Sequence, residues 1–118
     1  MRRLICLLIV GLAIVLSEPA LGHAFLERAS PSAGSTLQSA PPTVTITFSV
    51  PIESRFSVIE VQDEQGSRMD SGPVRMSDGN SIAVDLLKLP AGTYVVNWQA
   101  LSVDSHRSRG RFEFSVRS

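Results

Sequence analysis

The chain has 118 residues, with 11 Lys or Arg and 11 Asp or Glu, so its formal net charge at neutral pH is zero. Such a balance gives no electrostatic basis for binding nucleic acid or an anionic membrane surface, and we predict neither partner. The length is that of one domain with a modest hydrophobic core.

The first 22 residues have the order of a secretory signal peptide: two arginines, an apolar run over residues 4–16, and a short polar patch. Since crossing the hydrocarbon core takes about 20 residues, a permanent membrane anchor is the weaker interpretation. Small residues at Ala20 and Gly22 favour cleavage before His23. A cut after Ala24 also fits and would remove His23. We therefore expect a signal peptide over residues 1–22, an exported domain over 23–118, and no stable membrane insertion of that domain.

Cleavage at this position changes both the charge and the cysteine content of the chain. The basic count falls from 11 to 9 and the acidic count from 11 to 10, which gives the mature domain a formal charge of −1. The single cysteine, Cys6, leaves with the signal peptide. The mature domain therefore has neither a disulfide nor a thiolate for catalysis or for a soft metal site.

Alternation of apolar and polar residues runs through the rest of the chain, and it predicts strands rather than helices. Turn-forming residues separate these segments, and no stretch of ten residues has a convincing helical period. About seven short strands in about 100 residues predict an all-β fold, an immunoglobulin-like Greek-key β-sandwich or barrel. The expected strands, in chain order, are 25–29, 43–48, 57–62, 74–76, 81–86, 93–102 and 111–116.

The sequence also predicts the surroundings of several individual residues. Tyr94 follows a Pro-Ala-Gly turn at a strand start, where a hydroxyl in sandwiches often bonds an upstream backbone group, and Trp98 shares its face, so both are predicted core residues. Asp78-Gly79-Asn80 predicts a hairpin tip with a positive φ. Alternating arginines at 107, 109 and 111 are expected to line the solvated face before the last strand.

The chain contains only two histidines, His23 and His106. Asp104 is separated from His106 by one residue, so in extended backbone their side chains project to the same side. Taken alone, the pair is most simply an ordinary surface contact. If His23 is the first residue of the mature chain, however, its α-amine and ring Nδ1 can chelate a metal, and Asp104 and His106 can complete a set of three nitrogens and one oxygen.

Mixed nitrogen and oxygen donors favour Cu(II), which also leads the divalent ions in intrinsic affinity, with Zn(II) as the competitor. An α-amine with a pKa of about 7.7–8.0 and an imidazole near 6.5 compete for protons, so binding should weaken below about pH 6. Cu(I) prefers sulfur ligands. Met69 and Met76, the only methionines after the signal peptide, are interpreted as packing residues rather than a soft site.

With these residues in place, the sequence resembles the CopC/PcoC family of periplasmic copper-resistance proteins over essentially the whole mature chain. The resemblance lies in the opening His-Ala pair with a following Ser-Pro turn, in an L-P-x-G-x-Y-x-V-x-W block over 89–98, and in an S-x-D-x-H-x-x-x-G-x-F-x-F-x-V block over 102–116. It implies a periplasmic carrier or buffer that is not an enzyme and that binds one Cu(II) per chain through His23, Asp104 and His106. It also implies transfer of copper to an inner-membrane copper transporter or an outer-membrane copper protein.

The sequence departs from the family pattern in two places. Ser105 stands where the family usually has Gly between the aspartate and the histidine, and the methionine-rich segment of some members is missing. Two other classes remain alternatives. One is a copper oxidase or monooxygenase with a histidine chelate, and the other is an immunoglobulin-like interaction module without metal.

Overall fold

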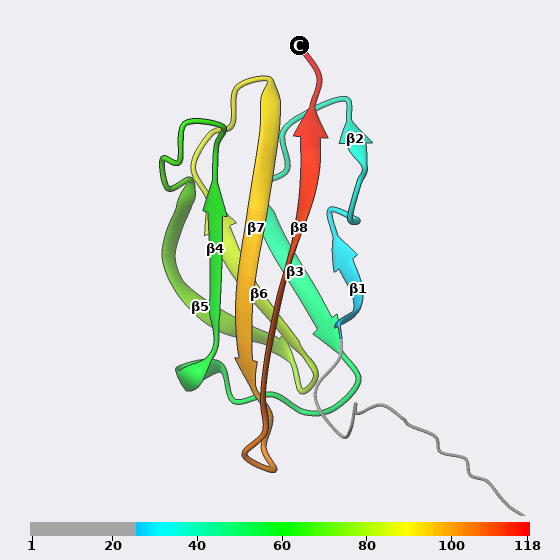
Figure 1. The fold of residues 1–118 in the computed structure, drawn as a ribbon, viewed down its shortest axis with the longest axis vertical. Helices are drawn as coiled ribbons and strands as arrows, with labels where there is room; N and C mark the ends of the chain where they lie inside the picture. The colour runs from blue at the N-terminus through cyan, green and yellow to red at the C-terminus, as the bar shows by residue number, and fades with distance from the viewer. Residues whose placement is uncertain (1–25) are drawn as a thin grey trace, which may run out of the picture.

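Residues 26–118 are described by the computed structural model, and they form two four-stranded sheets packed face to face (Figure 1). The predicted signal peptide over 1–22 and the predicted ligand His23 lie outside the described residues. No helix within 26–118 is long and apolar enough to cross a membrane. The predicted β-sandwich is confirmed, and the two separate sheets exclude the barrel alternative.

Each sheet mixes strands that are distant in sequence. The first has the order β1-β3-β6-β5 and the second the order β2-β8-β7-β4. Neighbouring strands are antiparallel except for β2 and β8, which are parallel. The strands are β1 (Leu26–Ser30), β2 (Thr36–Leu37), β3 (Thr43–Phe48), β4 (Val58–Gln62), β5 (Asp70–Asp78), β6 (Ser81–Leu86), β7 (Gly92–Leu101) and β8 (Arg107–Val116), with one 3-10 turn, η1 (Ser54–Phe56), before β4.

The strands bury the apolar side of their alternation between the two sheets, as predicted. Val44, Ile46 and Phe48 of β3 are fully buried, while the threonines between them are only partly so. All seven expected strands are present. The expectation was too short for β5, which has nine residues, and for β8, which begins at Arg107. Five of the six residues added to β5 are exposed, and the four added to β8 are Arg, Ser, Arg and Gly, so neither extension has an alternation of apolar and polar residues. The two-residue β2 was not predicted.

Tyr94 and Trp98 are core residues, as expected. The Tyr94 hydroxyl donates a hydrogen bond to the Pro90 carbonyl, which confirms the predicted bond to the upstream backbone. The Tyr94 ring stacks on Phe114, its cross-strand partner, with centroids 5.6 Å apart. Burial raises the pKa of the Tyr94 hydroxyl. Tyr94 and Phe114 therefore join β7 to β8 within the core.

The Trp98 ring lies between the Phe48 ring and the backbone of Gly110. Its ring meets Phe48 edge-on at 5.0 Å between centroids, and its cross-strand partner in β8 is Gly110. A Cβ at Gly110 would lie 2.8 Å from Trp98 Cζ2 and 3.0 Å from Cε2. Glycine is therefore required at this position by the volume of the indole rather than by an unusual φ.

The hairpin at 78–81 is confirmed, but the prediction of a positive φ at Gly79 is wrong. Among the described glycines, only Gly34, Gly66, Gly72 and Gly92 have positive φ. Asp78 pairs directly with Ser81, and the Asn80 N–H donates to Asp78 Oδ1 at 3.0 Å. A shift of register between Met76 and Asp78 accompanies the turn. The side chain of Asp78 and this bulge together allow a tight turn with ordinary dihedral angles.

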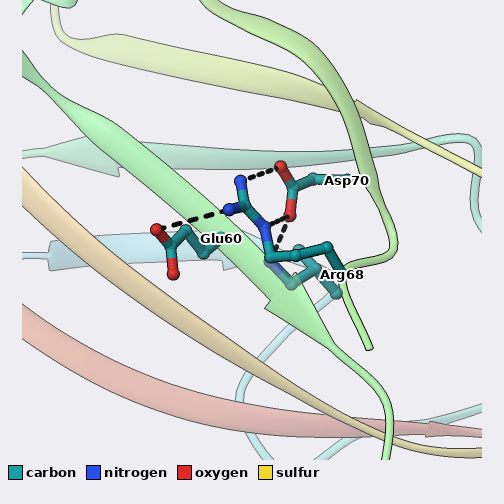
Figure 2. A network of polar contacts seen from close by, with 4 residues as sticks. Glu60, Arg68 and Asp70 are labelled. Carbon is teal, nitrogen blue, oxygen red and sulfur yellow. Dashed lines mark hydrogen bonds and ion pairs between the residues drawn. The ribbon is translucent and has the colours of Figure 1, made fainter. Parts of the chain in front are cut away.

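A charged cluster joins the two sheets where β4 faces the start of β5. Figure 2 shows Arg68 between Asp70 and Glu60: Nη2 lies 2.6 Å from Asp70 Oδ2, Nε 2.8 Å from Oδ1, and Nη1 3.6 Å from Glu60 Oε2. Asp70 Oδ1 also accepts the Val61 N–H at 2.8 Å. Burial by itself would raise the pKa of Asp70, but the hydrogen bonds from Arg68 and Val61 outweigh it and hold that pKa below its usual range.

Candidate metal centre

The predicted ligands Asp104 and His106 lie in the loop that joins β7 to β8. The Ser102 N–H donates to the His106 carbonyl at 2.9 Å, and the Ser105 N–H donates to the Ser102 carbonyl at 2.9 Å. Ser105 has a φ of 76°, and it is the one residue other than glycine with a positive φ among those described. This is the geometry of a three-residue hairpin loop whose last position is left-handed. Ser105 therefore occupies a position that favours glycine.

The structure brings Asp104 and His106 together, as the spacing predicted, but by a different route. We expected extended backbone to place both side chains on one side. Instead, the left-handed Ser105 turns the chain, and His106 Nδ1 lies 3.2 Å from Asp104 Oδ1. The His106 N–H also points to that oxygen, at 3.3 Å. The two side chains are 55% and 56% exposed, so an incoming ion can reach them.

The Ser102 side chain contacts both residues of the pair, a role that was not predicted from the sequence. It is 1% exposed, its hydroxyl donates to Asp104 Oδ1, and its Oγ lies 3.1 Å from the His106 carbonyl oxygen. The hydrogen bond from Ser102 lowers the pKa of Asp104, and the contacts with His106 add to this. The serine that precedes Asp104 by two positions was the available signal. That serine reaches Asp104 only because of the turn at Ser105.

Asp104 uses one oxygen for all of its contacts within the described residues. Ser102 Oγ, the His106 N–H and His106 Nδ1 all approach Oδ1. Oδ2 is therefore left for a further partner. A carboxylate that is kept ionised, oriented through one oxygen and open through the other has the arrangement expected of a metal ligand.

Strand β1 begins toward the end of the sandwich at which β7 and β8 are joined (Figure 1). Leu26 pairs with Phe48, whose N–H donates to the Asn80 carbonyl at 2.8 Å. The neighbouring Gly79 carbonyl accepts the Ile52 N–H at 3.2 Å, and Ile52 forms a bridge with Ser102. This chain of contacts connects the start of β1 to the base of the loop.

The described residues alone do not form a complete metal site. Within 26–118, no group of three or more His, Cys, Asp and Glu side chains could hold a metal ion. Met69 packs against the core, as its interpretation as a packing residue predicted, whereas Met76 is an exposed residue of β5 and does not fit that interpretation. Asp104 and His106 are thus a pair and not a group of that size within the described part of the chain.

Comparison with known proteins finds a matching family model and a similar sequence. The family model described as CopC domain matches residues 26–117. The copper transport protein CutJ of Bacillus subtilis is 34% identical over 106 residues, which is 87% of this chain but 20% of CutJ. The chain thus spans about a fifth of that relative.

Two solved structures agree in fold as well as in sequence. The crystal structure of CopC from Methylosinus trichosporium OB3b superposes with a TM-score of 0.73 at 32% identity, covering 80% of this chain and 94% of that one. The structure of PcoC, described as a methionine-rich copper resistance protein from Escherichia coli, has a TM-score of 0.71 at 30% identity, covering 81% of this chain and all of PcoC. The present chain has three methionines in all.

Proposed function

The chain belongs to the CopC domain family, and from this premise we propose that it is an exported copper-binding protein that carries or buffers one Cu(II) ion in copper resistance or homeostasis. In this proposal residues 1–22 are a signal peptide, and residues 23–118 are the mature domain, which acts in the periplasm and is not an enzyme. Copper is the cargo. A membrane copper transporter is the proposed partner.

The observation that carries the proposal is the arrangement of the loop at 102–106. Asp104 is held through Oδ1 by a buried serine, which leaves Oδ2 open, and His106 lies beside it with an exposed ring. Asp104 is ionised at neutral pH, and the hydrogen bond from Ser102 lowers its pKa further, so the carboxylate adds negative charge to a site that receives a divalent cation. Imidazole and carboxylate are both suitable Cu(II) ligands.

The remaining ligands in this proposal come from His23. Leu26 begins β1 at the end of the sandwich that carries the loop, and three extended residues can span about 10 Å. A free amine and Nδ1 at residue 23 would supply two nitrogens. The proposal therefore depends on cleavage after Gly22. Cleavage after Ala24 would leave the described fold intact and remove these two ligands.

The test begins with expression of the full precursor with export, followed by mass measurement of the mature chain and titration with Cu(II). We expect one Cu(II) per chain with a type-2 electron paramagnetic resonance spectrum. One extra residue before His23 should change that spectrum and weaken binding. Equal affinity and an unchanged spectrum in the extended protein would show that the amine is not a ligand.

The loop ligands are tested separately. Asp104→Ala and His106→Ala should each weaken Cu(II) binding, whereas Asp85→Ala, an exposed aspartate of β6 on the other sheet, should not. Affinity should also fall below about pH 6 as the amine and imidazole groups take up protons. Unchanged affinity in both loop variants would leave only an N-terminal chelate and would refute the role assigned to the loop.

A further inference from the structure

Three arginines form a row on the outer face of the second sheet, beginning one residue after His106. Arg107, Arg109 and Arg111 occupy alternate positions of β8 and are all exposed. Alternate positions of a strand lie on one face about 6.6–6.8 Å apart. This confirms the expectation that they line a solvated face. It also places three guanidinium groups in a line that starts at the proposed metal loop.

The row has little acidic neutralisation from the described residues. Arg111 lies 4.0 Å from Glu113, and no ion pair within 26–118 involves Arg107 or Arg109. Arg68 and Arg75, by contrast, have carboxylates at 2.6 Å and 2.9 Å. Two successive outward positions of β8 thus carry arginines that form no ion pair among the described residues. Mutual repulsion within such a row makes an external anionic partner favourable.

A groove runs beside this row and supplies further hydrogen-bond donors. Its volume is about 460 Å³, and its lining includes Val58 and Glu60 of β4, Asn97 and Gln99 of β7, and Arg109 and Arg111 of β8. The register pairs Gln99 with Arg109 and Asn97 with Arg111, so these two arginines each have a side-chain amide on the neighbouring strand, whereas Arg107 pairs with Leu101. Glu60 is 3.6 Å from Arg68 and is therefore already engaged. The groove is open to solvent and is lined by three strands, unlike an enclosed site for a small molecule.

We propose that this face, the β8 arginine row with its groove, is a docking surface for an acidic, extended segment of a protein partner. Carboxylates at alternate residues of an extended segment have the same spacing as the arginines, and guanidinium groups bind carboxylates through two parallel hydrogen bonds. A segment bound here would place the partner protein beside His106 and beside Val103, an exposed apolar residue of the same loop. The docking itself does not require copper; its role in copper transfer rests on the proposed function above.

The probe is a synthetic decapeptide of alternating Glu and Thr, with a Gln-Thr peptide of the same length as its neutral control. Binding to the mature protein without copper is measured by NMR shift mapping and by titration at low and moderate salt. We expect shifts on β7 and β8, affinity that falls with salt, and no binding of the neutral peptide. Changing Arg107, Arg109 and Arg111 together to Gln should weaken binding about tenfold or more.

The matched control changes Arg28, Arg75 and Lys88 together to Gln, which removes the same charge away from β7 and β8. It should alter the affinity less than about twofold. Equal losses in the two triple variants, shifts on the first sheet, or tighter binding to anionic lipid vesicles than to the peptide would overturn the proposal. Cu(II) titration of the β8 triple variant should match wild type. If wild type fails to bind Cu(II) while the peptide result holds, the metal site is refuted and the docking surface is not.

Discussion

Gly110→Ala is the sharpest test of how the core fixes the β7–β8 pair. The added methyl group would lie 2.8, 3.0 and 3.1 Å from three atoms of the Trp98 indole. These atoms belong to a rigid ring, and Phe48 meets the same ring edge-on at 5.0 Å between centroids. Neither the strand pairing nor the ring can shift without disturbing a second contact, so the methyl group cannot be accommodated cheaply.

The magnitude follows from overpacking. Extra atoms forced into a filled core typically cost about 1–3 kcal/mol, and the rigidity of this site places it in the upper part of that range. A glycine that can accept a Cβ would instead gain about 0.4–1 kcal/mol from reduced entropy of the unfolded chain. We therefore expect Gly110→Ala to lower the free energy of unfolding by about 2–3 kcal/mol and Tm by about 10–20 °C.

The assay is urea and thermal unfolding followed by circular dichroism, with Gly79→Ala as the matched control. Gly79 has an ordinary φ and nothing within 4 Å of a built Cβ, so its variant should be as stable as wild type or slightly more. In the double variant with Trp98→Phe, the smaller ring should recover about 1 kcal/mol or more of the Gly110→Ala loss. Equal stability of the two glycine variants, or strict additivity with Trp98→Phe, would refute the steric explanation.

Three further predictions concern single residues. Ser105→Gly should raise the free energy of unfolding by about 0.5–1 kcal/mol because φ is 76° there, whereas Ser77→Gly on exposed β5 should lower it by about 0.5–1 kcal/mol; urea unfolding distinguishes the two signs. Asp70→Asn should lower the free energy of unfolding by about 1.5–3 kcal/mol at neutral pH. The same change at the exposed Asp85 should lower it by under about 1 kcal/mol. Because the folded pKa of Asp70 is lowered, its contribution is present above about pH 4 and lost below it, so the Asp70→Asn deficit should shrink in acid; a constant deficit contradicts this. Tyr94→Phe should cost about 1 kcal/mol through the lost bond to Pro90, and spectrophotometric titration of the single tyrosine should show ionisation above its usual pH.

Much of the fold was predictable because the interior strands have complete alternation. β3, β6 and β7 each place apolar residues at every second position, and that pattern is sufficient to identify a strand with one buried face. β5 lacks the pattern because it is an edge strand with seven of its nine residues exposed. β2 has two residues and exists only through its pairing with Ser115 and Val116, so local sequence contains no signal for it.

The candidate site was predictable in its residues but not in its geometry. The Asp-x-His spacing and the scarcity of histidine identified Asp104 and His106, and the structure places the two side chains in contact. The support from Ser102 could not be deduced, because its hydroxyl reaches Asp104 only when Ser105 adopts a left-handed φ. A serine at a position suited to glycine is a poor predictor of that turn, since the conformation is imposed by the closure of β7 onto β8.

The two sequence blocks over 89–98 and 102–116 act as one physical unit. Ten consecutive pairs align β7 with β8, from Gly92 with Val116 to Leu101 with Arg107. Trp98 of one block fits against Gly110 of the other, and the buried Ser102 closes the hairpin above them. The core therefore determines where Asp104 and His106 lie before any metal arrives. All of these contacts lie within the described residues, so they do not depend on the proposed cleavage, whereas the proposed copper site does.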